Sequence, residues 1–181
     1  MSRPPAFPGL RPAGPADAPA LEALRASIES WLAERGIQQW TPGEIALKQV
    51  EQQIADGDWH VLDHHGRIVA GLRYLRSDPQ VWPDNAAAAY LHGVMVDRRL
   101  AGAGLGTHLL SWAETRATAE GLTRLRLDFV ESNAVLRRYY RSHGFTEVGR
   151  RDFDNGWFSI TLMEKPLGAR NRTFQSRPTP R

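Results

Sequence analysis

The sequence predicts a single α/β domain in which a mixed β-sheet is flanked by helices on both faces. Two observations lead to this fold class. Segments with apolar residues at helical spacing alternate along the chain with shorter segments whose pattern is that of β-strands. A glycine-rich loop also joins a central apolar segment directly to a helical one. The expected order of elements is β-α-α-β-β-β-α-β-α-β-β.

The first part of the chain is expected to form an edge strand and two helices. Residues 7–11 lie in a proline-containing opening, and proline is tolerated in an edge strand. A helix is expected from Asp17, a good N-cap, to Gly36. The stretch Thr41-Pro42-Gly43-Glu44 has the pattern of a capping box with proline at the first helical position, which predicts a second helix ending near Ala55.

A hairpin, a central strand and a third helix are expected next. Residues 59–62 and 68–75 are predicted to be antiparallel strands joined by a turn at His64-His65-Gly66. Residues 88–96 hold the β-branched and aromatic residues of a buried strand. After the glycine-rich loop, apolar residues at helical spacing predict a helix over 105–120.

The last part of the chain is expected to contain three strands and one short helix. Residues 122–129 alternate leucine and phenylalanine with charged residues, which predicts a strand. Residues 133–142 are expected to form a helix that Gly144 ends. The final strands are predicted over 145–150 and 157–164.

The length and charge distribution favour one globular domain. The 181 residues suffice for one domain, expected over 1–167 with residues 1–8 as a flexible arm. Residues 168–181 hold four arginines and no acid, so they are expected to form a disordered basic tail. Removing these four charges from the net +3 leaves −1 for the rest of the chain. A nucleic-acid partner is therefore not expected.

Composition also bounds the compartment and the chemistry. The 41% apolar and 24% charged content is that of a soluble protein. No apolar run is long enough to span a bilayer, and the start of the chain lacks an apolar signal core. We therefore expect a cytoplasmic protein without a membrane partner. The absence of cysteine excludes disulfides, thiolate metal ligands and a cysteine nucleophile.

The glycine-rich loop has the features of an anion site. Gly102, Gly104 and Gly106 omit side chains where a helix begins, so free N–H groups and the helix dipole point at one place. Such a turn suits a phosphate or pyrophosphate. It lacks the lysine of a P-loop, and its glycine spacing does not fit a dinucleotide fingerprint.

Two motifs resemble those of one enzyme family. Arg99-Leu100-Ala101-Gly102-Ala103-Gly104 resembles the Arg/Gln-x-x-Gly-x-Gly/Ala signature of the GNAT superfamily of acyl-CoA-dependent N-acetyltransferases. The stretch from Asn133 to Phe145 resembles the helix that follows the fifth strand in the same family. One helix and one strand separate the motifs, as the GNAT fold requires. The resemblance covers about residues 8–167.

The resemblance implies acetyl-CoA as the acyl donor and assigns residues to it. Tyr140 occupies the position of the tyrosine that protonates the departing CoA thiolate, whereas the neighbouring Tyr139 is expected in the core. Asn133 is expected to bind the pantetheine arm, and the strand backbone around Val94, Met95 and Val96 is expected to bind the thioester oxygen. The residues expected to hold the pyrophosphate are Arg99, Gly102, Gly104, Leu105, Gly106 and Thr107.

The general base is less defined. His92 lies on the strand near the expected thioester and titrates in the useful range, so it is one candidate. Asp128 and Glu131, near the end of the next strand, are others. Ordered water is a further alternative in this family. No metal is expected.

The acceptor is expected to be a small-molecule amine. In this family the acceptor pocket is built from the first two helices, their link and loops near the last strands, and here those segments carry Trp31, Trp40, Trp82 and Trp157. Aromatic walls suit a flat or cationic molecule. The alternatives are a protein or peptide amine, or a catalytically inactive domain that binds acyl-CoA as a sensor or partner-binding module. Family members are often dimers, so a homodimer is an expectation.

Overall fold

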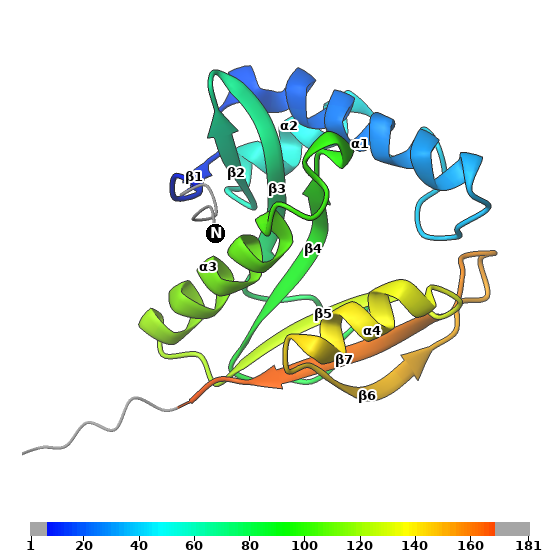
Figure 1. Ribbon diagram of the computed structural model, residues 1–181. Helices are drawn as coiled ribbons and strands as arrows, with labels where there is room; N and C mark the ends of the chain where they lie inside the picture. Colours follow the sequence, from blue (N-terminus) through cyan, green and yellow to red (C-terminus); the bar gives the residue numbers. More distant parts are fainter. Residues whose placement is uncertain (1–6, 169–181) are drawn as a thin grey trace, which may run out of the picture.

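A seven-stranded mixed β-sheet runs through the computed structural model, which describes residues 7–168 (Figure 1). Its strand order is β1-β2-β3-β4-β5-β7-β6, and all neighbours are antiparallel except β4 and β5. The strands are β1 (Arg11–Pro12), β2 (Trp59–His64), β3 (Arg67–Leu75), β4 (Ala88–Val96), β5 (Arg124–Val130), β6 (Thr146–Arg151) and β7 (Ile160–Pro166). The helices are α1 (Ala18–Glu34), α2 (Leu47–Ala55), α3 (Leu105–Ala119) and α4 (Ala134–Ser142), with 3₁₀ turns at Pro15–Asp17 and Arg98–Leu100.

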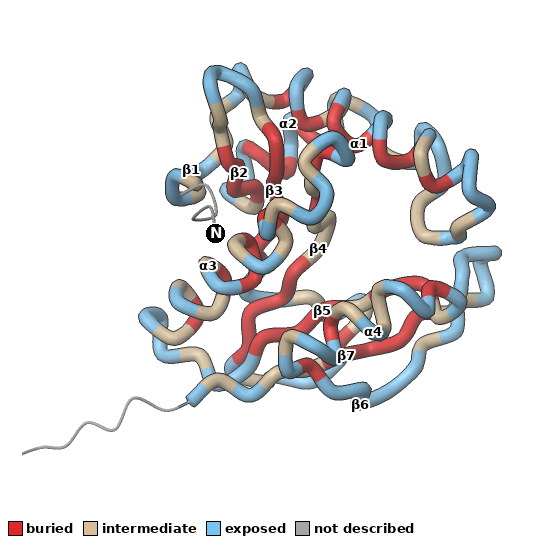
Figure 2. Tube along the Cα trace, viewed as in Figure 1, coloured by how far each residue is buried: buried red, intermediate tan, exposed pale blue. Residues whose placement is uncertain are grey.

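The predicted element order and the placement of helices on both faces are confirmed. Val61 and Leu62 are neighbours on β2 but belong to different hydrophobic cores, because successive side chains of a strand point to opposite faces. Val61 packs with α1 and α2, and Leu62 belongs to the core that contains Leu109 of α3 and Tyr140 of α4. Buried residues accordingly follow the central strands in Figure 2. No helix within residues 7–168 has the length and apolar character needed to cross a bilayer.

Some predicted boundaries were wrong for physical reasons. The second helix begins at Leu47 and not near Thr41. Gly43 has φ +75°, which is incompatible with a helix interior, and the Glu44 carboxylate binds the Arg25 guanidinium at 3.1 Å. The capping box therefore does not form.

The two ends of the described chain also differ from expectation. The first strand is Arg11–Pro12 and not residues 7–11, and the last strand begins at Ile160 and not at 157. Most of the predicted arm and tail, residues 1–6 and 169–181, lies outside the described residues.

A local irregularity in β4 opens the sheet. The parallel pairing of β4 with β5 runs from Ala88↔Arg124 to Leu91↔Leu127 and stops there. The pairing of β4 with β3 shifts register at this level, and Gly93 has φ +54°. A β-bulge of this kind bends the strand and increases its local twist. Beyond Leu91, β4 and β5 separate (Figure 1). The cavity described below lies between them.

Candidate functional site

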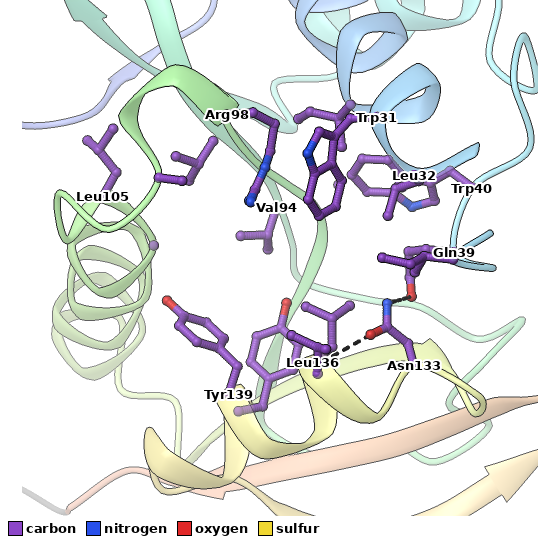
Figure 3. A pocket seen from close by; sticks show the side chains of 18 of the residues that line it. Trp31, Leu32, Gln39, Trp40, Val94, Arg98, Leu105, Asn133, Leu136 and Tyr139 are labelled. Atoms are coloured by element: carbon purple, nitrogen blue, oxygen red, sulfur yellow. Dashed lines mark hydrogen bonds between the residues drawn. The ribbon is translucent and has the colours of Figure 1, made fainter. Parts of the chain in front are cut away.

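A cavity of about 640 Å³ lies where β4 and β5 diverge (Figure 3). Its walls come from the end of α1, the α1–α2 link, β4, the glycine-rich loop, the start of α3, β5 at Asp128 and one face of α4. A cavity of this volume is in the range of small-molecule and cofactor sites. It brings together most of the residues that the two sequence motifs single out.

The glycine-rich loop presents bare backbone to this cavity. The Asp97 carboxylate accepts a hydrogen bond from the Arg99 amide at 3.0 Å and starts the turn. Gly102 and Gly104 both have φ near +85°, and a Cβ added at either would meet nothing within 4 Å. Gly104 is the N-cap of α3, so the first amides of a 15-residue helix have no intrahelical partner. The loop therefore offers an unobstructed cradle for an anion.

The two arginines of the loop have different environments. The Arg99 guanidinium binds the Asp97 carboxylate at 2.6 and 3.0 Å and does not line the cavity. Its neighbour Arg98 does line the cavity, with its guanidinium 4.0 Å from the ring centroid of Trp31. Arg99, and not Arg98, stands at the first position of the motif, so sequence reasoning assigned the phosphate contact to Arg99 and missed Arg98.

Tyr139 of α4 packs against the start of α3. A Cβ at Gly106 would collide with the Tyr139 hydroxyl, so a larger residue there requires the Tyr139 ring to move. Thr107 Oγ1 is 3.0 Å from His143 Nε2, which also ties the two helices together. Tyr139 is half-buried and lines the cavity, although the sequence predicted it in the core, and burial raises its pKa. The contact of His143 with Thr107 was not predicted from the sequence.

Tyr140 is buried and lines the cavity. Its ring lies 5.9 Å from that of Phe129 and 5.8 Å from that of Phe145, which fix its position. Burial, the adjacent Tyr139 and the Asp128 carboxylate raise the pKa of Tyr140 well above its usual range. The phenol therefore stays protonated at neutral pH, as a proton donor must.

His92 on β4 is held between two carboxylates. Its Nε2 lies 2.9 Å from Oδ2 of Asp78, in the β3–β4 loop, and its Nδ1 lies 3.7 Å from Oδ2 of Asp128 on β5. His92 and Asp128 line the cavity. Burial opposes the charged imidazolium, but the hydrogen bond with Asp78 and the two carboxylate charges outweigh it and raise the pKa of His92. Burial likewise raises the pKa of Asp128.

These three side chains also form a candidate metal-ligand set. One ligand atom from each lies within 4.8 Å of the others, and two carboxylates with an imidazole suit a divalent cation. However, the 2.9 Å contact between His92 and Asp78 already pairs two of the three ligand groups with each other. Asp78 thus fixes one ring nitrogen of His92, and the other, Nδ1, faces Asp128 at 3.7 Å.

Asn133 joins α4 to the α1–α2 link. Its Oδ1 accepts from the Leu136 amide at 3.2 Å and caps α4, and its Nδ2 donates to Gln39 Oε1 at 3.2 Å (Figure 3). The same Gln39 oxygen accepts from the Val130 amide at 3.3 Å. The link thus spans the cavity from α1 to the end of β5. Gln39 lies in a segment without a motif and was not predicted.

Several predicted residues lie elsewhere. Val94 and Val96 line the cavity, and the side chain of Met95 between them is buried in the core under α1 and α2, which does not bear on the prediction for the strand backbone. Glu131 pairs with Arg150 at 3.0 Å outside the cavity.

The four tryptophans predicted to line the acceptor pocket divide into two pairs. Trp31 and Trp40 line the cavity, and the Arg25 guanidinium covers Trp40 at 4.3 Å from its ring centroid. Trp82 is buried in a separate cluster with Tyr90, and Trp157 is 59% exposed. Neither of these two lines the cavity.

The chain is similar to known acetyltransferases. The family model described as the acetyltransferase (GNAT) family matches residues 25–145. A Bacillus subtilis (strain 168) protein described as the uncharacterized N-acetyltransferase YesJ is 32% identical over 142 residues, which cover 74% of this chain and 78% of that protein.

Solved structures of such enzymes share the fold. A GNAT-family acetyltransferase from Listeria monocytogenes 4b F2365 has 28% identity and a TM-score of 0.74, over 87% of this chain and 94% of that one. A ribosomal-protein-alanine N-acetyltransferase from Brucella melitensis has 23% identity and a TM-score of 0.68, over 87% and 99% of the two chains. At 23% identity, the likeness to the Brucella melitensis enzyme concerns the fold alone.

Proposed function

Because the chain belongs to the acetyltransferase (GNAT) family of N-acetyltransferases, we propose that it acetylates a primary amine of a small-molecule acceptor with acetyl-CoA. One observation carries the proposal. The glycine-rich loop at the start of α3, the Tyr140 phenol and the His92 imidazole all line one cavity. An anion cradle, a proton donor and a proton acceptor are the groups that amide formation from a CoA thioester requires.

The cavity walls fit acetyl-CoA. The open backbone at Gly102 and Gly104 and the free amides of α3 suit its pyrophosphate, and Arg98 adds a positive charge nearby. Asn133 lies farther along the same cavity, where its amide suits the pantetheine arm. When bound, acetyl-CoA supplies a thioester whose C–S bond breaks as the amide C–N bond forms.

The residues of the chain then divide the proton transfers between them. His92 accepts a proton from the acceptor ammonium, which frees the amine lone pair for attack. The backbone of β4 near Val94 and Val96 has no β5 partner at this level and offers an N–H donor for the thioester oxygen. Tyr140 gives its proton to the leaving sulfur. The chain has no cysteine, which favours direct attack in a ternary complex over a thioester intermediate on the enzyme.

The shape of the cavity favours a small acceptor. The α1–α2 link carries Trp40 and Gln39 across one end, and Gln39 is bound to the end of β5. An extended peptide needs an open groove, whereas this link leaves room for a compact amine. A protein or peptide amine stays the alternative acceptor, because the Brucella melitensis relative is named for acetylating a ribosomal protein. A non-catalytic acyl-CoA-binding domain is the alternative from another class.

A CoA-release assay with a panel of amines tests the proposal. Acetyl-CoA is offered with polyamines, amino acids, aminoglycosides, alkylamines and N-terminal peptides, and binding of acetyl-CoA is measured in parallel by thermal shift. Turnover with a small amine supports the proposal. Turnover with peptides alone shows that the acceptor is a protein or peptide amine. Stabilisation by acetyl-CoA without turnover of any amine favours the non-catalytic domain.

A further inference from the structure

We propose that Asp128 binds the ammonium group of the acceptor and so makes the enzyme select cationic alkylamines over neutral aromatic amines. This inference rests on the proposed acetyl transfer. It goes further, because it names the charge that the acceptor carries and the residue that recognises it.

The Asp128 carboxylate has no hydrogen-bond partner within the described residues. Its Oδ2 is buried without a hydrogen bond, in a side chain that is only 17% exposed. Leaving a buried carboxylate oxygen unpaired is costly. Asp128 also lines the cavity, so the missing donor is to be sought in a molecule that enters it.

The distance to His92 defines where that donor sits. Asp128 Oδ2 and His92 Nδ1 are 3.7 Å apart, too far for a hydrogen bond with each other. An ammonium nitrogen placed beside both atoms donates one N–H to Asp128 Oδ2 and points a second at His92 Nδ1. Asp78 binds Nε2 of the same ring, so Nδ1 is the nitrogen left for the acceptor.

The proton balance follows from this geometry. The ammonium gives one proton to neutral His92 Nδ1 and becomes a neutral amine, which keeps its hydrogen bond to Asp128. The amine then forms the C–N bond while the C–S bond breaks, and Tyr140 protonates the sulfur. The new amide nitrogen then holds one excess proton, which passes to solvent. Solvent also reprotonates the Tyr140 phenolate and takes the proton from His92, so the enzyme returns to its starting state. Asp78 serves as a positioning residue that holds the ring.

The charges around the site favour a cation. Asp78 and Asp128 face His92 from the β3–β4 loop and from β5, and Tyr140 faces Asp128 from α4. On β3, Arg73 is the nearby cation, but its guanidinium binds Asp58 at 2.6 Å. With a neutral imidazole the site carries two negative charges. An alkylammonium compensates one of them, whereas a neutral aromatic amine offers Asp128 a hydrogen bond but no compensating charge.

Asp128→Asn tests the inference with two amine probes. Phenethylamine is a cation at pH 7.5 and aniline is neutral. The variant should lower kcat/KM for phenethylamine by about tenfold or more, since a hydrogen bond between charged groups contributes that much. It should change kcat/KM for aniline by less than about threefold. Asp56→Asn, the same substitution on an exposed residue after α2, should change neither.

The other outcomes separate the two proposals. An equal loss for both probes, with an unchanged dissociation constant for acetyl-CoA, overturns the selectivity and leaves acetyl transfer in place. Absence of turnover by the wild-type protein with every amine of the panel overturns the proposed function and this inference with it. Loss of wild-type activity in EDTA and its recovery with Zn²⁺ assigns the three side chains to a cation and also overturns the inference.

Discussion

Replacing Gly93 by alanine tests whether the β4 bulge is required for the fold around the cavity. Gly93 has φ +54°, a conformation that residues with a Cβ rarely adopt. Its added Cβ would lie 2.9 Å from Cη2 of Trp59. The indole cannot move away easily, because it is buried and its Nε1 donates to Gln53 at 2.9 Å.

The expected loss of stability has two parts. Forcing alanine into the left-handed region costs about 1–2 kcal/mol. Inserting a methyl group into the packed contact with Trp59 costs about 1–3 kcal/mol. The free energy of unfolding should therefore fall by about 2–5 kcal/mol, and the melting temperature by about 5–15 °C for a domain of this size.

Urea denaturation followed by circular dichroism measures this change. Gly149→Ala on β6 is the matched control, since Gly149 has no positive φ and its Cβ would make an ordinary 3.5 Å contact with Leu162. The control should change the free energy by less than about 1 kcal/mol. If Gly93→Ala loses no more than the control, the strain and packing assigned to the bulge are refuted.

Three further predictions concern the surroundings of the cavity. Arg25→Met should lower the free energy of unfolding by about 3–5 kcal/mol, because the Glu29 carboxylate, 2.7 Å away, is then buried without its partner. Asn133→Ala should cost about 1 kcal/mol through loss of the α4 cap and should raise KM for acetyl-CoA. As a base acts in its neutral form, kcat/KM should rise with pH through the pKa of His92, above its ordinary value of 6.5, and Asp78→Asn should move this rise to lower pH.

Each of these has a control or a contrary result. Equilibrium denaturation measures Arg25→Met, and a loss below about 1 kcal/mol contradicts the role of the buried pair. Asn133→Asp keeps the capping oxygen but loses the amide donor. Its free energy of unfolding should therefore return to the wild-type value, whereas its KM for acetyl-CoA should stay raised as in Asn133→Ala. If Asp78→Asn does not shift the pH at which kcat/KM rises, this rise is due to the titration of a group other than His92.

Local patterns explain which parts of the fold were predictable. The glycine-rich loop, the start of α4 and the alternation along β5 are set by neighbouring residues, so the sequence alone indicates them. The start of α2 was mispredicted because Glu44 binds Arg25, 19 positions away, and does not cap the helix. A contact of this kind is decided by tertiary packing.

The same distinction applies to the site. Tyr140 and Gly104 were found because their motifs place them on known positions of one helix or loop. Gln39 and Asp78 reach the site from segments without regular periodicity, so nothing in their neighbourhood indicates where their side chains point. Trp157 shows the converse: its residue type suggested a pocket wall, but its loop leaves it exposed.

The most direct test of acetyl transfer with Tyr140 as the acid is a comparison of wild type with Tyr140→Phe at saturating amine. The phenyl ring fits the same space between Phe129 and Phe145, so KM for acetyl-CoA should stay within about threefold. Loss of a general acid should lower kcat by about tenfold or more. An unchanged kcat, under conditions where acetyl transfer limits the rate, would show that another group protonates the thiolate and would contradict the account.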